Sequence, residues 1–286
     1  DSPSIAGAYE FDIQPGETTT MDTRSRLFPR RTISQIGVAP LTSMYFFGPA
    51  RRTGRDDFRD AVHDSGALQM IHGSGRRLLR PLSNPSRVRV SAFQDENPKG
   101  FGLTQRRRDF GFYQDAEARY EKRPSAWIEP FGNWGSGQIM LVEIPVQDEF
   151  NDNIVAFWRP RAPLEPSAEG HAFEYRLHWC AEPPDAAPLA RVHATRSGRS
   201  INAPDKRIMV VDFRLGELPQ ANLKPVLWSS GGDPSAPTLR ALPGGELTRI
   251  AFEFTPGRTE VLEFQLKLAG PDADASETWM YQWPAP

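Results

Sequence analysis

In ELTRIAFEF, the stretch from Glu246 to Phe254, large apolar side chains occupy every second position toward the end: Ile250, Phe252 and Phe254. Gln138 to Val146 (QIMLVEIPV) and Arg207 to Phe213 (RIMVVDF) follow related patterns, bounded by turn-forming residues. A period of two is typical of antiparallel strands that bury one face. Only Asp56 to Val62 and Asp115 to Lys122 have a helical pattern, and both are short. We therefore predict an all-β fold.

The composition indicates how these strands are divided along the chain. The 286 residues suffice for one large domain or two ordinary ones, and 27 prolines with 23 glycines favour many short strands. Residues 181–188 (AEPPDAAP) are rich in proline and lack an apolar period, as expected of a linker. We place a large antiparallel β-sandwich at 1–181, a linker at 182–190 and a second domain at 191–286.

The second domain contains seven predicted strands, at about 190–197, 207–213, 222–229, 237–242, 246–254, 258–268 and 276–283. Seven short strands with regular turn signals indicate an immunoglobulin-like sandwich, although the cysteine and tryptophan signature of antibody domains is absent. We expect this domain to hold no catalytic group. Its acids, such as Glu277, are expected to be solvated.

Several function classes lack their sequence signals. The net charge of -2 gives no reason to expect a nucleic-acid partner, and no apolar run is long enough to span a membrane. Cys180 is the only cysteine, so no intrachain disulfide can form. His63 and His72 are too isolated to predict a zinc site, and no P-loop or nucleophile elbow occurs. We predict neither a metal nor another cofactor.

Four polar and aromatic clusters stand out from the strand pattern, at residues 62–66, 100–106, 123–135 and 149–158. Together they supply carboxylates, aromatic rings, arginine, glutamine and asparagine. Aromatic rings pack on the apolar faces of sugars, and the polar groups bond their hydroxyls. The mixture therefore favours a carbohydrate ligand.

Asp64 and Asp152 are the best pair of carboxyls for cleaving a glycosidic bond, which requires one acid and one base or nucleophile. Asp152 lies between two asparagines, just after Asp148 and Glu149. Crowded carboxylates raise one another's pKa, and a carboxyl that stays protonated near neutrality can serve as a general acid. The alternative is that these acids cap a solvated turn.

The remaining candidates are predicted substrate contacts. Those that we select are Tyr120, Arg123, Trp127, Trp134, Gln105, Arg106, Glu149 and His63. The tryptophans lie among glycine and proline residues, where strand packing does not dictate an aromatic side chain. For them the alternative is a place in the core.

These clusters, in this order, resemble the periplasmic glucan biosynthesis proteins G and D, which serve osmoregulated periplasmic glucans of Gram-negative bacteria. The matching motifs are Pro40-Leu41-Thr42-Ser43-Met44, Val62-His63-Asp64-Ser65, Asn97-Pro98-Lys99-Gly100-Phe101-Gly102-Leu103, Gln105-Arg106, Glu117-Ala118-Arg119-Tyr120, Arg123-Pro124-Ser125-Ala126-Trp127, Val142-Glu143-Ile144-Pro145, Asp152-Asn153-Ile154-Val155-Ala156-Phe157-Trp158 and Ser276-Glu277-Thr278-Trp279.

The resemblance implies a β-sandwich with a cleft, a linker and an immunoglobulin-like domain. Some members resemble inverting endo-β-1,2-glucanases, which implies that Asp152 is the general acid and that Asp64 is a general base acting through a relay of water and substrate hydroxyls. The resemblance also implies a β-1,2-linked glucan as ligand, a periplasmic location and docking of other glucan-synthesis proteins on the C-terminal domain. Inversion requires the two carboxyls to lie more than about 6 Å apart.

The sequence departs from the family pattern in two respects. Family members carry a long N-terminal half of the sandwich before the point where this chain begins, so we expect either a fragment or a partner chain. Gly132-Asn133-Trp134 replaces the family's Gly-Asp-Trp, and residues 48–52 also differ. Two alternatives to hydrolysis stay open: a noncatalytic glucan-binding scaffold of the synthesis machinery, and a transglycosylase that shapes the glucan. Assignment to the G or the D type is open as well.

Overall fold

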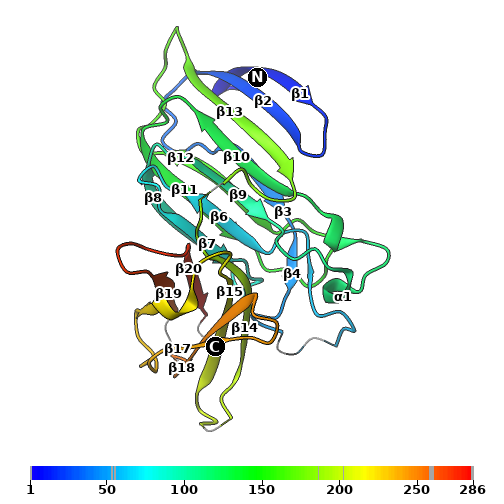
Figure 1. The fold of residues 1–286 in the computed structure, drawn as a ribbon. Helices are drawn as coiled ribbons and strands as arrows, with labels where there is room; N and C mark the ends of the chain where they lie inside the picture. Colours follow the sequence, from blue (N-terminus) through cyan, green and yellow to red (C-terminus); the bar gives the residue numbers. More distant parts are fainter. Residues whose placement is uncertain are drawn as a thin grey trace.

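The computed structural model describes residues 2–52, 54, 56–185, 187–201, 203–257 and 261–284. The regular structure is almost entirely β, which confirms the predicted fold class (Figure 1). The strands are β1 (Ile5–Gln14), β2 (Thr19–Pro29), β3 (Val38–Ser43), β4 (Tyr45–Phe47), β5 (Val62–His63), β6 (Ala67–Ile71), β7 (Arg77–Pro81), β8 (Arg89–Glu96), β9 (Gly100–Thr104), β10 (Ser125–Phe131), β11 (Ser136–Glu143), β12 (Ile154–Pro160), β13 (His171–Cys180), β14 (Arg191–Arg199), β15 (Arg207–Arg214), β16 (Lys224–Ser229), β17 (Thr238–Ala241), β18 (Leu247–Phe254), β19 (Leu262–Ala269) and β20 (Thr278–Trp283).

The two predicted helices are wrong. Residues 56–62 are irregular up to β5, and 115–122 contain only the 3₁₀ turn Tyr120–Lys122, whereas the short helix α1 spans Phe110–Tyr113. Asp57 Oδ1 accepts a hydrogen bond from Arg59 N, and Asp115 Oδ1 accepts bonds from the next turn of backbone. Such side-chain bonds compete with helical ones, so aspartate at the start of each stretch favours a turn.

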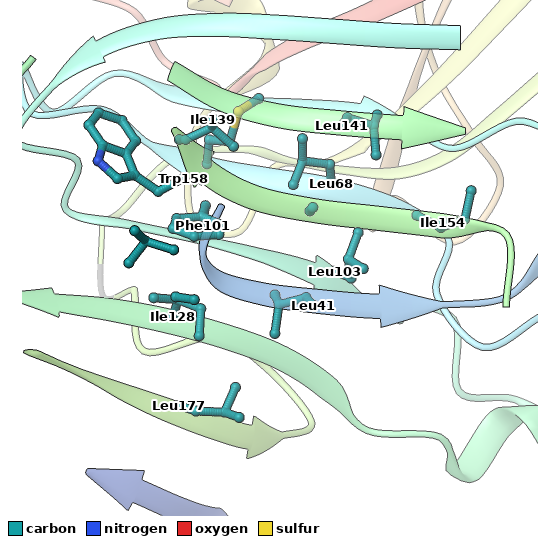
Figure 2. Packing of buried hydrophobic residues seen from close by; sticks show 14 of the residues in the cluster. Leu41, Leu68, Phe101, Leu103, Ile128, Ile139, Leu141, Ile154, Trp158 and Leu177 are labelled. Atoms are coloured by element: carbon teal, nitrogen blue, oxygen red, sulfur yellow. The ribbon is translucent and has the colours of Figure 1, made fainter. Parts of the chain in front are cut away.

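The main core lies between two antiparallel layers. A ten-stranded sheet runs in the order β1-β2-β13-β10-β9-β6-β7-β20-β19-β16, and its first part is covered by a sheet in the order β3-β12-β11-β8. Leu68, Phe101 and Ile128 of the large sheet face Leu41 and Ile139 of the smaller one (Figure 2). The alternation of the strands explains why one face of each sheet is apolar.

The C-terminal strands form a second pair of layers. All seven predicted strands are present, within a few residues of their expected ends. The sheet β14-β15-β18-β17 packs against β20, β19 and β16, with Phe213 and Phe252 facing Phe264 and Trp279 across a second core. β20 also pairs in parallel with β7, so this three-stranded layer continues the large sheet at the far end from β1 (Figure 1).

Glu277, expected to be solvated, is instead buried at this junction, with 3% of its surface exposed. Its carboxylate forms a bidentate pair with Arg106, and Arg106 Nη2 lies 2.8 Å from Glu277 Oε2. Val192 N donates to the same carboxylate at 2.6 Å. The prediction failed because strand alternation says nothing about a cation supplied from another layer. A buried carboxylate is tolerated when it is paired and hydrogen-bonded.

Candidate active site

The segment from Ser43 to Tyr45 brings the two predicted catalytic aspartates together. Asp64 N donates to Met44 O at 2.9 Å, and Asn153 N donates to Ser43 O at 3.1 Å. The amide of Asn153 adds two bonds to the backbone of Tyr45, at 2.8 and 3.0 Å. Asp64, directly after β5, and Asn153, the residue between Asp152 and β12, are therefore attached to the same short stretch of chain.

Asp64 is a partly buried carboxylate with a perturbed pKa. Burial raises its pKa above the ordinary value, the positive charge of Arg123 opposes the rise, and the negative charge of Asp152 adds to it. Arg123 Nε lies 3.2 Å from Asp64 Oδ1 but is not aligned for a hydrogen bond, so this buried oxygen has no hydrogen-bond donor among the described residues. The mutual influence of the two aspartates places them within electrostatic reach of each other.

Asp152 is exposed, and its carboxylate forms no hydrogen bond within the described part of the chain. The neighbouring acids are occupied. Asp148 Oδ1 accepts bonds from Phe150 N and Asn151 Nδ2, both at 3.0 Å, and Glu149 is paired with Arg59. Asp148 therefore caps the turn, and Asp152 is left free to meet a ligand.

Arg123 forms the surface beside Asp64, whereas Tyr120 lies beneath it, with only 3% of its surface exposed, contrary to the prediction that it contacts substrate. The guanidinium of Arg123 lies 5.9 Å from the centre of the Tyr120 ring, a cation–π distance. Burial raises the pKa of the Tyr120 phenol, and the charges of Glu149 and Asp64 raise it further. Of the ten predicted site residues, the structure thus gathers five here: Asp64, Asp152, Tyr120, Arg123 and Glu149.

Gln105 and His63 lie beneath this surface, contrary to the prediction that they contact substrate. Gln105 is fully buried, and its Nε2 donates to the carbonyls of His63 and Tyr120 at 2.7 and 3.4 Å. The His63 ring stacks on Tyr45 at 5.2 Å and meets the edge of Tyr113 at 5.3 Å. Both residues therefore support the backbone beside Asp64 instead of reaching a ligand.

The two tryptophans predicted as sugar platforms are core residues, 1% exposed for Trp127 and 6% for Trp134. Trp127 covers the glycines of β9, and a Cβ added to Gly100 would lie 2.2 Å from its Cζ2. Trp134 packs against Trp158, at the end of β12 away from Asp152. Both tryptophans lie among glycine and proline residues in the sequence, but their rings are nevertheless packed in the core.

Arg106 also lies away from the site, contrary to the prediction. In addition to Glu277, it donates to Gln69 Oε1 and to Val192 O, both at 2.9 Å. Its donors are thus directed at the C-terminal layers and at Gln69 of β6, away from Asp64. Neighbouring positions in a sheet strand or its continuation alternate in direction, which separates Arg106 from Gln105 although the two are adjacent in sequence.

One charged residue at the site was missed. Arg59 lies in the stretch Asp56-Asp57-Phe58-Arg59-Asp60, which was interpreted as a helix, and it binds Glu149 from a distant part of the sequence. The acids beside Arg59 in the sequence do not indicate that its partner is a distant residue. The only local signal for a position near the site is the short spacing between Arg59 and the Val62-His63-Asp64 motif.

Within the described ranges, no group of three or more His, Cys, Asp and Glu residues is arranged to hold a metal ion. Among the same residues, no helix has the length and apolar character needed to cross a membrane.

Curated relatives and a family model match almost all of the chain. The family model "Periplasmic glucan biosynthesis protein, MdoG" covers residues 1–283. "Glucans biosynthesis protein G" of Vibrio cholerae serotype O1 is 49% identical over 286 residues, which is 99% of this chain and 52% of the relative. The proteins of the same name from Shewanella baltica (strain OS195) and Shewanella sp. (strain ANA-3) are each 45% identical, over 99% of this chain and 53% and 52% of their own lengths. The chain therefore spans about half the length of these relatives, and it belongs to the periplasmic glucan biosynthesis protein MdoG family.

Proposed function

We propose that this chain cleaves β-1,2-linked glucan by inversion. Asp152 would donate a proton to the leaving glycosidic oxygen, and Asp64 would accept, through a substrate hydroxyl, the proton of the attacking water. The relatives are named for glucan biosynthesis, which favours a glucan as substrate. The family description favours a periplasmic location.

The state of Asp64 carries this proposal. Its Oδ1 is buried without a hydrogen-bond donor among the described residues, and its pKa is raised by burial. A carboxylate with a raised pKa is a stronger base, and an unpaired oxygen leaves room for the hydroxyl that would pass a proton to it. Asp152, exposed and unbonded, is free to approach a glycosidic oxygen.

A sugar contact would come from Arg123. Arg123 is half exposed, so its donors can reach the hydroxyls of a bound sugar while its charge stays near Asp64. Tyr120, which is buried, would support Arg123 through its ring instead of reaching the sugar. If the chain acts together with other glucan-synthesis proteins, the C-terminal layers would be the surface on which those proteins dock.

Incubation with linear β-1,2-glucan tests the proposal, reading product size together with the anomeric form of the first product. We expect shorter glucans of inverted configuration. Asp152→Asn and Asp64→Asn should each lower turnover by about 10²- to 10⁴-fold, the usual contribution of a general acid or base. Asp148→Asn is the matched control, because asparagine can cap the same turn.

The alternatives give different results in the same assay. Binding of the glucan without any change in its size would identify a scaffold. Products longer than the substrate would identify a transglycosylase. Wild-type turnover in Asp152→Asn would show that the proposed acid is wrong.

A further inference from the structure

Arg59 binds three carboxylates from three separate segments. Its Nε and Nη2 hold Asp57 at 3.0 and 2.9 Å, its Nη1 lies 2.6 Å from Asp115 Oδ2, and its Nη1 and Nη2 hold Glu149 at 3.2 and 2.7 Å. A guanidinium has five N–H donors, and each of them is used. The side chain is only 13% exposed.

Two of these segments carry residues of the site. Asp115 Oδ1 also accepts bonds from Glu117 N and Ala118 N, at 3.0 and 2.7 Å, and so shapes the turn that leads into Tyr120. Glu149 lies three residues before Asp152 in the other segment. Arg59 is therefore the bridge between the turn before Tyr120 and the segment that ends in Asp152.

The bridge has a defined geometry. Two of the three contacts are bidentate, which fixes the plane of the guanidinium against both carboxylates. The side chains of Asp115 and Glu149 are 10% and 21% exposed, so water screens these pairs only in part. The hydrogen bonds to Asp57 and Glu149 raise the pKa of Arg59, which keeps it charged at any pH of interest. Without that charge, three neighbouring carboxylates would repel one another.

We infer that Arg59 is a positioning residue that sets the place of Asp152 relative to Tyr120, Arg123 and Asp64. The inference rests on the proposed function, because it assigns Arg59 to the geometry of that reaction. An inverting pair must keep a separation that admits water, and a displacement of about 1 Å can lower the rate by about 100-fold. A residue that locks the two segments together satisfies this need without touching the substrate.

The test compares Arg59→Ala and Arg59→Lys with the control Arg24→Ala. Arg24 lies in β2 and pairs with Glu10 at an exposed position, where ion pairs contribute little. We expect Arg59→Ala to lower kcat by about 10- to 100-fold with a smaller change in KM. Lysine keeps the charge but cannot form the bidentate contacts, so Arg59→Lys should fall between Arg59→Ala and the wild type. Arg24→Ala should match the wild type.

Hydrogen–deuterium exchange gives a readout that does not depend on activity. In Arg59→Ala, exchange should rise in both 115–122 and 145–153 and stay unchanged in the strands of the main core. Unchanged exchange in these segments, or raised exchange with wild-type kcat, would overturn the inference. A wild-type protein without turnover would overturn the proposed function instead, and exchange would still decide whether Arg59 joins the two segments.

Discussion

Three neighbouring polar residues in this chain have three different tasks. Asp148 caps a turn through Phe150 N, Asn153 is fully buried and bonds the backbone of Tyr45, and Asp152 points to solvent with no partner among the described residues. The chemistry of an aspartate therefore depends on which backbone groups are within its reach. The two asparagines beside Asp152 bond other groups: Asn153 holds the backbone of Tyr45, and Asn151 donates to Asp148. The carboxylate of Asp152 is therefore left free.

The burial of His63 should make the stability of the protein depend on pH. Burial lowers its pKa from 6.5 to about 4, and its Nδ1 has no hydrogen-bond partner within the described residues. The unfolded chain binds a proton below pH 6.5 while the folded protein does not, so His63 should cost stability as the pH falls from 6.5 toward 4. The loss should approach roughly 3 kcal/mol at pH 4.

His63→Phe removes this titration and keeps an aromatic ring against Tyr45 and Tyr113. We expect the difference in unfolding free energy between the variant and the wild type to shift in favour of the variant as the pH is lowered from 7 to 4. Urea denaturation at several pH values measures it. A difference that stays constant over this range would mean that His63 is protonated in the folded protein.

Strand β9 shows how one element serves two faces of a sheet. Phe101 and Leu103 enter the main core (Figure 2). Gly100 and Gly102 lie on the opposite face of the strand, against Trp127. The glycines of this Gly-Phe-Gly motif are thus needed for packing. Because each glycine lacks a Cβ, the ring of Trp127 can pack directly against the backbone of β9.

Gly100→Ala should therefore destabilise the fold. The new Cβ would meet the buried indole of Trp127 at 2.2 Å, and neither the ring nor the strand has room to move. We expect a loss of about 1–3 kcal/mol in chemical denaturation, typical of overpacking. Gly198→Ala in β14 is the matched control, because its nearest neighbour would lie at 3.8 Å. Equal stability of the two variants would contradict the packing argument.

The whole molecule is joined across its two cores by β7, β20 and one buried ion pair. Ser197 Oγ adds a bond to Ala50 O at 2.6 Å, and Ala67 and Leu79 of the first sandwich pack into the C-terminal core. The C-terminal layers are therefore attached along a continuous sheet as well as through side chains. Their stability should depend on the pair at the centre of the junction.

Glu277→Ala tests that dependence. Removing one partner leaves the charge of Arg106 buried and unpaired, which typically costs about 3–5 kcal/mol. We expect a loss of this order in denaturation by guanidinium chloride. Arg214→Ala, which breaks the exposed pair with Glu246, should change stability by less than about 1 kcal/mol. Recovery of most of the loss in the double variant Arg106→Met/Glu277→Leu would identify the unpaired charge as the cause.

The sequence by itself determined the strands. Period-two patterns and turn residues are local signals, and they located the seven C-terminal strands and the all-β class because the alternation of apolar and polar side chains lies within each strand itself. The motifs around Asp64 and Asp152 were likewise visible as unusual polar clusters among apolar runs.

Tertiary structure alone decided which of those residues face a ligand. Trp127 and Gln105 turned inward, Arg106 paired with Glu277, and Arg59 reached Glu149 from 90 positions away. Burial and ion pairing depend on segments that meet only when the sheets close, so no local pattern carries that information. The side chains of this site were thus selected by long-range packing, whereas the strands that carry them were specified locally.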